Sequence, residues 1–513
     1  MAYMMLPEFS DVCTLGVVIA TVTSVLLAAL VTRNKASKRP WEGSTGQAYV
    51  DRDFVTHADL VDPEIRGNHL AFNAHLHARF AGQRFLPVRG EDGCFIAFAH
   101  AICKDAMNDG STFSSNPFPD GRLVALNTMS KADHSRVLRY VHSHYTQLGV
   151  ANLEDRIRAV IERCTDELED GSGGDVVTWA KRVHMASTLA RLGVDWDPTC
   201  NTGGPASWNR VDEVIALNDA MVALVAPLGG VGKQYSTLPH GQFLRVLLGL
   251  IRSLPPTLLM FLRLGFSCAW EIIRPDVTVL WPPRQPRMGL WWHPELLPLV
   301  PRYFLALHKL LTHQSAAEGP LEGIRKGVES GDLKLAEALT LLVQLMVNMT
   351  SANALANLVY RLGSEKAAAE EVAADPDRLA AAFVQEVLRL DAPLQRNPRR
   401  VARPVAGKWA DCPLQEGNQV LLFLGAANMD PTVFEDPDKF RLGRETVPLS
   451  FGSGMHYCLG SNLVKLEMRA ALECLLRRFS SVEVVSSYQR LVDVDVGNWG
   501  FRRLEVRLRR KSA

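Results

Sequence analysis

The sequence lacks an excess of charge of either sign. Its 513 residues contain 56 lysines and arginines against 55 aspartates and glutamates. A chain so balanced presents no strong electrostatic field to attract nucleic acid or another anionic partner. We therefore expect no nucleic-acid binding. The length is sufficient for a sizeable hydrophobic core.

Paired cysteine motifs are also missing. The nine cysteines are scattered along the chain, without a CxxC pair, at positions 13, 94, 103, 164, 200, 268, 412, 458 and 474. An odd, scattered set is typical of reduced thiols in the cytosol, and it excludes a disulfide framework and the usual zinc spacings. The chain also lacks internal repeats, low-complexity tracts and long Gly/Ser linkers.

Charge is absent from one long run near the N-terminus, CTLGVVIATVTSVLLAALVT. A run of this length can cross a bilayer as a helix. Acidic residues precede it and the basic segment RNKASKRP follows it. The positive-inside rule then predicts a lumenal segment at 1–12, a transmembrane helix at 13–32, a basic linker at 33–49 and a cytosolic domain at 50–513. A cleaved secretory signal is the alternative, but its basic residues normally precede the apolar run.

Beyond residue 50 the pattern is mainly helical. Apolar residues recur at three-to-four spacing near 153–169, 335–362 and 379–390, which predicts helices there. Short strand-like pieces such as RRVARPV and QVLLFLG lie among them. The segment 275–301 is rich in Pro and Trp, and its prolines exclude a continuous helix, so we expect a loop over the core or against the membrane. The predicted fold class is mainly α with small β-sheets.

One short segment, FGSGMHYCLGSN, sets three glycines around Cys458 directly before a helix-like run. Glycines let the backbone approach a large flat ligand where side chains would collide. A helix that begins just after the cysteine directs its positive N-terminal end at the sulfur. A single cysteine in this setting is suited to bind haem iron as a thiolate. A buried cysteine in an ordinary glycine-rich turn is the alternative.

Four motifs, in order, carry a resemblance to a known family. FGSGMHYCLG resembles the haem-binding signature FGxGxHxCxG of the cytochrome P-450 family, and Glu386 with Arg389 resembles its ExxR pair. RNPRRVARPV is similar to the strand that follows that pair, and residues 426–444 are similar to the ANRDP and meander region. The resemblance is continuous over 335–480, where it is closest to bacterial members. It implies the cytochrome P-450 fold, in which the ExxR pair is buried and braces the cysteine loop.

The resemblance also implies roles around a haem b (iron-protoporphyrin IX) cofactor. Cys458 would be the axial ligand of the iron, and Phe451 would pack beside its sulfur. His456 would bind a haem propionate. Arg400 would pair with a propionate as well, with a slip of register to Arg399 as the alternative.

Propionate binding also involves an earlier segment, KADHSRVLRY, which is similar to the family's DPPEHTRLRR and makes His134 a propionate ligand. The family's second basic ligand usually falls four residues after this histidine, where the present chain has Leu138. We expect Arg139 to take its place, with Arg136 as the next choice.

The central helix departs from the family pattern. The family has (A/G)GxxT there, usually with an acid before the threonine, so that oxygen enters and protons are relayed. The aligned residues 346–350 read MVNMT, so Thr350 is present but the glycine and the acid are not. We expect Thr350 to be the catalytic residue for proton delivery. Ordered water could act with it, held by Ser351, Asn348 or Asn353.

Two functional classes remain open. The first is a monooxygenase in the endoplasmic reticulum membrane that oxidises a hydrophobic small molecule, with electrons from NADPH-cytochrome P-450 reductase and cytochrome b5 as a further candidate donor. Bacterial-like motifs behind an added anchor resemble some fungal enzymes of secondary metabolism. The second class is a haem-thiolate isomerase, dehydratase or peroxide user. A haem-free structural protein is a distant third possibility, given four matching motifs.

Overall fold

The structure is a computed structural model, and part of the chain lies outside its description. It describes residues 52–56, 59–60, 62–116, 126–168, 175–193, 211–212, 214–216, 219, 307, 311, 319–346, 349–491 and 497–511. The predicted anchor at 13–32, its flanking segments 1–12 and 33–49, and the Trp-rich segment 275–301 therefore lie outside the described residues.

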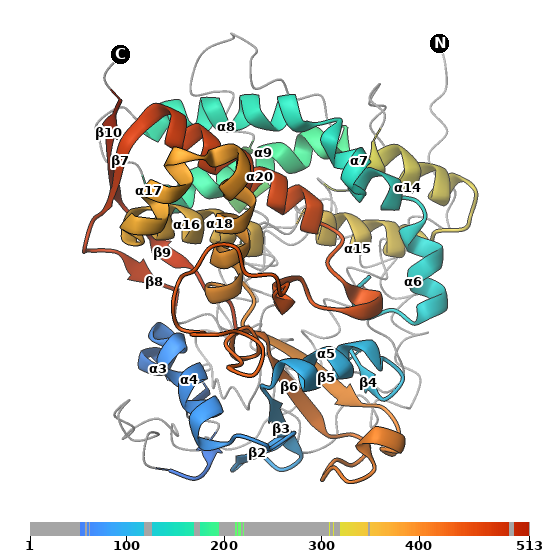
Figure 1. Cartoon of the computed structure of the whole chain (residues 1–513). Coiled ribbons are helices and arrows are strands. Elements are labelled where there is room, and N and C mark those ends of the chain that lie inside the picture. Colours follow the sequence, from blue (N-terminus) through green and yellow to red (C-terminus); the bar gives the residue numbers. More distant parts are fainter. Residues whose placement is uncertain are drawn as a thin grey trace, which may run out of the picture.

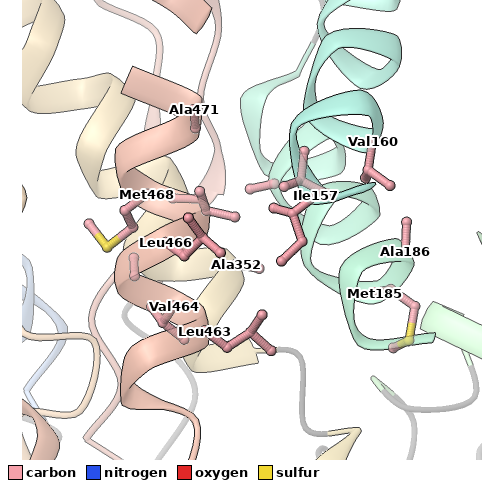
Figure 2. Packing of buried hydrophobic residues seen from close by; sticks show 14 of the residues in the cluster. Ile157, Val160, Met185, Ala186, Ala352, Leu463, Val464, Leu466, Met468 and Ala471 are labelled. Atoms are coloured by element: carbon pink, nitrogen blue, oxygen red, sulfur yellow. The ribbon is translucent and has the colours of Figure 1, made fainter. Parts of the chain in front are cut away.

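Long helices form the body of the molecule (Figure 1). Apolar side chains from five of them share one core, part of which Figure 2 shows with Ile157, Ala186, Ala352 and Leu466 among its members. Small residues such as Ala352 let the helix axes approach closely, and the larger side chains fill the remaining space. These helices are α8 (Glu154–Leu168), α9 (Val176–Leu192), α16 (Met349–Ser364), α18 (Pro376–Leu390) and α20 (Ser461–Arg478).

A six-stranded mixed sheet occupies the other end of the molecule (Figure 1), with the strand order β1-β2-β3-β6-β5-β4. The two strand-like pieces RRVARPV and QVLLFLG supply β5 and β6, which pair antiparallel. Two further two-stranded sheets join β7 with β10 and β8 with β9. The strands are β1 (Val55–Thr56), β2 (Leu86–Arg89), β3 (Cys94–Ala97), β4 (Phe113–Ser114), β5 (Arg396–Val401), β6 (Gln419–Phe423), β7 (Phe479–Val484), β8 (Gln489–Arg490), β9 (Phe501–Arg503) and β10 (Val506–Arg510).

Shorter helices connect the sheet and the helical body. They are α3 (Pro63–Gly67), α4 (His69–Arg79), α5 (His100–Asn108), α6 (Lys131–Leu138), α7 (Gln147–Ala151), α14 (Pro320–Glu329), α15 (Leu335–Leu345), α17 (Lys366–Ala374) and α19 (Leu424–Ala427). Single 3-10 turns are η1 (His142–Tyr145), η6 (Gly407–Trp409), η7 (Leu449–Phe451) and η8 (Gly454–His456). The prediction of a mainly helical chain with small sheets is confirmed.

The long helix predicted near 335–362 is present as two helices, α15 and α16. Among the described residues, the stretch Glu337–Ser364 is long and apolar enough to cross a membrane by length and composition, yet most of it is buried inside the protein. Its packing against α9 and α20 accounts for its apolar character.

Candidate functional site

The cysteine loop folds back on itself before α20 begins. Gly452 and Gly454 have φ angles of 76° and 72°, in the left-handed region where a side chain would be strained. The backbone N–H of Cys458 donates to the carbonyl of Phe451 at 2.9 Å. The loop therefore holds Cys458 immediately before the first turn of α20.

The sulfur of Cys458 receives backbone hydrogen bonds. The N–H groups of Gly460 and Ser461 point at it and favour its thiolate form, as does the ammonium of Lys465. Burial outweighs these effects and raises the pKa of the Cys458 thiol. The same side chain nevertheless has exposed surface. A Cβ added to Gly460 would stand 4.0 Å from the sulfur, at ordinary van der Waals distance.

Two predicted propionate ligands meet in the structure. The ring centroids of His134 on α6 and His456 on η8 are 5.1 Å apart, edge to face. Burial lowers the pKa of His134. Burial, followed by the charges of His134 and Arg399, lowers the pKa of His456 to about 4. Nδ1 of His456 is buried and has no hydrogen-bond partner among the described residues. An anion placed there would raise the imidazole pKa again and draw a proton onto the open nitrogen.

The structure brings Arg399, rather than Arg400, beside His456. Arg399 is buried, burial lowers its pKa to about 10, and no carboxylate in the described part of the chain pairs with it. Its Nη1 donates only to Asn397 and to the Pro398 carbonyl. Arg400 points to the other face of β5, where its Nε donates to the Asn116 carbonyl at 3.4 Å. Neighbouring residues of a strand face opposite sides, so the geometry favours the alternative register, Arg399, and the propionate role of Arg400 stays a prediction.

Arg139, the other predicted propionate ligand on this segment, lies away from the two histidines. It is exposed, and its guanidinium pairs with Asp332 and Tyr140. Five residues on a helix turn the side chain by roughly 140° at 3.6 residues per turn, so Arg139 leaves α6 on a different face from His134. Arg136 is committed to Glu337 at 2.6 Å. Neither arginine joins the two histidines.

The ExxR pair lies in the interior, as the resemblance implies. Arg389 donates through Nη2 and Nε to the two carboxylate oxygens of Glu386 at 2.7 and 2.8 Å, and both side chains are buried. Arg444, from the predicted meander, adds a third member at 3.0 Å from Glu386. Arg389 also donates to the carbonyls of Asn428 and Pro437. The pair therefore fastens the meander onto α18.

A second set of hydrogen bonds connects the meander and α18 to the start of the cysteine loop. The Asn428 amide donates to the Ser450 hydroxyl at 2.9 Å, and its Oδ1 accepts from the Leu449 N–H at 2.7 Å. Ser450 in turn donates to the Leu388 carbonyl on α18. The start of the cysteine loop is thus held directly against the helix of the ExxR pair.

Thr350 lies in the first turn of α16 and is half-buried. Met349, at the position where the family usually has an acid, is 3.8 Å through Sδ from Nδ2 of Asn498. α15 ends at Leu345 and α16 begins at Met349, and the sequence between them lacks the family glycine. Residues 347 and 348 lie outside the described residues, so the alternative relay residue Asn348 has no structural description.

Two members of the site could have been found from the sequence. Val401, an apolar residue two positions after Arg399, marks the buried face of β5, and period-two alternation puts Arg399 on that face. Lys465 stands one helical turn beyond Ser461, and its ammonium lies 5.3 Å from the centre of the Phe451 ring. A cation this close to the sulfur favours its anionic form.

The residues present fit a haem. The part of the chain that the structure describes has no cluster of three or more His, Cys, Asp or Glu that could hold a metal ion. His134, His456 and the uncompensated guanidinium of Arg399 offer partners for two carboxylates.

Comparisons with known proteins agree with this geometry. The family model described as "Cytochrome P450" matches residues 378–490. The biotin biosynthesis cytochrome P450 of Bacillus subtilis is 34% identical over 183 residues, which cover 35% of this chain and 45% of the relative. The chain thus spans less than half the length of the curated relatives it matches.

The fold extends the likeness over most of the chain. The structure of a mutant of P450 EryK in complex with erythromycin B covers 87% of this chain and 99% of its own, with a TM-score of 0.64 and 21% identity. The enzyme CxnD, for C–S bond formation in chuangxinmycin biosynthesis, covers 90% and 98%, with a TM-score of 0.64 and 18% identity. Because only 18–21% of the aligned residues are identical, these structures show that the fold is shared and no more than that. The chain therefore has the cytochrome P450 fold, and over residues 378–490 its sequence matches the cytochrome P450 family model.

Proposed function

We propose that this chain is a haem-thiolate monooxygenase that oxidises a hydrophobic small molecule. The observation that carries the proposal is the sulfur of Cys458, held at the N-terminus of α20 with two backbone N–H groups directed at it. Haem b bound there would supply dioxygen activation with two electrons from a redox partner, and insertion of one oxygen atom into the substrate. Hydroxylation, desaturation, ring closure and coupling all belong to this chemistry.

Different residues of the chain would bind the iron, hold the propionates and transfer protons. Cys458 would bind the iron, and the amides of Gly460 and Ser461 would limit the charge on its sulfur. His134, His456 and Arg399 would hold the propionates. Thr350 Oγ1 would accept protons from water and pass them on. The solved relatives named above concern erythromycin B and chuangxinmycin, which supports a substrate from secondary metabolism.

Replacing Arg399 by leucine tests the propionate assignment. A hydrogen bond to a charged group contributes roughly 1.5–3 kcal/mol, so we expect haem affinity to fall about 10–100-fold. The measurement is the rate at which haem passes from the protein to an excess of a haem-binding acceptor. Arg400→Leu is the matched control on the same strand and should lose haem at nearly the parent rate. Faster loss from the Arg400 variant than from the Arg399 variant would restore the sequence-based assignment.

Thr350 decides between the two functional classes. General acid assistance is worth about 10²–10⁴-fold in rate, so Thr350→Ala should slow product formation within that range while reductant is diverted to hydrogen peroxide. Product and peroxide formed per reductant consumed are measured together. The contrary result is a variant that matches the parent in both product and peroxide, with product that forms even without reductant or dioxygen. These results would favour the alternative isomerase, dehydratase or peroxide-using function. The observation behind that alternative is Met349, which cannot relay a proton.

We further propose a single-pass location in the endoplasmic reticulum membrane, with the catalytic domain in the cytosol and NADPH-cytochrome P450 reductase as donor, cytochrome b5 being a second candidate. Only the composition of residues 13–32 supports this location. Deleting residues 1–40 should release most of the protein from washed membranes while haem incorporation continues. Complete retention after alkaline carbonate treatment would contradict a single anchor. Partial retention would indicate a second contact in the segment 275–301.

A further inference from the structure

Buried polar atoms without partners gather around one turn of the chain, Gly497–Gly500. Eleven buried side-chain nitrogen or oxygen atoms of the described residues lack a hydrogen-bond partner. Five of them belong to residues packed around this turn, although they come from distant parts of the sequence. Such atoms are rare in folded proteins, and each requires an explanation. We call this set the polar seam; it consists of His69 Nδ1, Asn73 Nδ2, Asn353 Nδ2, Asn357 Oδ1 and Arg490 Nη1.

One side of the polar seam borders a recess at the surface. His69, Asn73 and the backbone turn Gly497–Trp499 line the recess together with Arg66 and Arg396, and no carboxylate lines it. The His69 ring contacts Trp499 at a tilt of 51°, with the ring centroids 3.8 Å apart, and its Nε2 donates to the Leu390 carbonyl at 3.1 Å. Since that nitrogen carries the hydrogen, Nδ1 of the neutral ring is an acceptor. Asn73 Nδ2 is a donor, so both hydrogen-bonding characters are present at the recess.

The other side of the polar seam is a face of α16. Asn353 packs against Gly500, where an added Cβ would approach its side chain to 2.4 Å. Asn357 donates through Nδ2 to the carbonyls of Asp391 and Trp499, which leaves its Oδ1 open. The two asparagines are four residues apart and share one helix face. They too offer one donor and one acceptor.

The same face leads to Thr350. Thr350, Asn353 and Asn357 are spaced by three and four residues, so they form one polar stripe along α16. Asn498 both lines the recess and contacts Met349 at the start of that helix. The turn Gly497–Gly500 therefore separates the recess from the first turn of α16 by one layer of residues.

We propose that ordered water fills the polar seam and connects the surface recess with Thr350, and that this water delivers protons in place of the missing carboxylate. A buried water needs about two to four polar partners, and the seam supplies unpaired donors and acceptors on both sides of the turn. Proton delivery rests on the monooxygenase function proposed above. The presence of ordered water in the polar seam does not depend on that function.

A crystal structure of the holoenzyme, at a resolution that shows ordered water, tests the hydration directly. We expect waters within hydrogen-bonding distance of His69 Nδ1, Asn73 Nδ2, Asn353 Nδ2 and Asn357 Oδ1, in a chain that reaches Thr350. A dry seam would overturn the proposal whatever reaction the enzyme performs.

Asn353→Leu tests proton delivery, because leucine has a similar size but holds no water. We expect several times more hydrogen peroxide per reductant consumed and a smaller share of product, with an unchanged haem spectrum. Its midpoint of unfolding in denaturant should also fall, because displaced water leaves Asn357 Oδ1 unpaired. Ser187→Ala is the matched control, since it removes a buried, unpartnered hydroxyl from α9. It should behave like the parent.

Asn73→Leu, at the recess end, provides a second variant if Asn353→Leu does not fold. A folded variant could lack the seam water in its crystal structure and still form as much product per reductant consumed as the parent. That result would overturn the role of the water in proton delivery. A parent enzyme that forms no product from dioxygen would instead refute the proposed function and with it the delivery step, while the crystal structure would still decide the hydration.

Discussion

Replacing Cys458 by serine is expected to abolish the thiolate-type absorbance of the reduced, carbon monoxide-bound protein and to reduce product formation to background. Cys458 is the only cysteine in the glycine-framed loop at the N-terminus of α20. A serine hydroxyl remains protonated where a thiol ionises, so it cannot offer the iron an equivalent anionic ligand. The difference spectrum and turnover of purified protein are the measurements.

Cys103 and Cys474 provide the controls. Both are buried outside the glycine-framed loop, Cys103 on α5 and Cys474 near the end of α20, so neither stands in the setting that suits a haem ligand. Cys103→Ser and Cys474→Ser should keep the thiolate-type spectrum, although each places a hydroxyl in the core and lowers stability. A thiolate spectrum that persists in Cys458→Ser, or is lost selectively in one of the controls, would refute the assignment of the iron ligand.

Glu386→Ala is expected to lower the free energy of unfolding by about 3–5 kcal/mol, because it leaves the charge of Arg389 buried and unpaired. Folded proteins are stable by only about 5–15 kcal/mol, so the variant should be poorly folded or retain little haem. Arg444 loses its acceptor in the same variant. Denaturant unfolding, followed together with haem absorbance, measures both effects.

The matched control lies on the same helix. Arg378 pairs with Asp375 at 2.7 Å with the same three-residue spacing as Glu386 and Arg389, but both members are exposed. Arg378→Ala should cost less than about 1 kcal/mol. Glu386→Gln, which keeps part of the hydrogen bonding, should lie between the two. Equal costs for Glu386→Ala and Arg378→Ala would mean that the ExxR pair does not brace this fold.

The sequence predicted those parts of the site whose residues are close along the chain. Glu386 and Arg389 stand on one face of a helix because they are three residues apart. Cys458 precedes a helix because the apolar spacing after Ser461 is helical. Such features depend on local periodicity, and the structure has α18 and α20 where the patterns predicted helices. The apolar spacing over 335–362 likewise predicted helix, and α15 and α16 lie there.

The choice among neighbouring arginines depended on the tertiary structure. A resemblance aligned Arg400 and Arg139 with the haem, but a shift of one residue reverses the face on a strand and turns a helical side chain by about 100°. The alternation with Val401 favours Arg399 as the buried member, and the packing of β5 shows that it is. Likewise, only the tertiary structure shows that the Arg139 guanidinium forms an ion pair with Asp332.

The sequence by itself therefore determined the helical class, the cysteine loop and the helix of the ExxR pair, because short-range hydrogen bonding and apolar spacing specify these features locally. The tertiary structure alone decided which residues meet. Arg444 reaches Glu386 across 58 positions, and His69 and Asn353 contact the turn Gly497–Gly500 from two distant segments. Such contacts form when the apolar faces of separate segments pack into one core. Local sequence patterns do not predict which polar atoms this packing brings together.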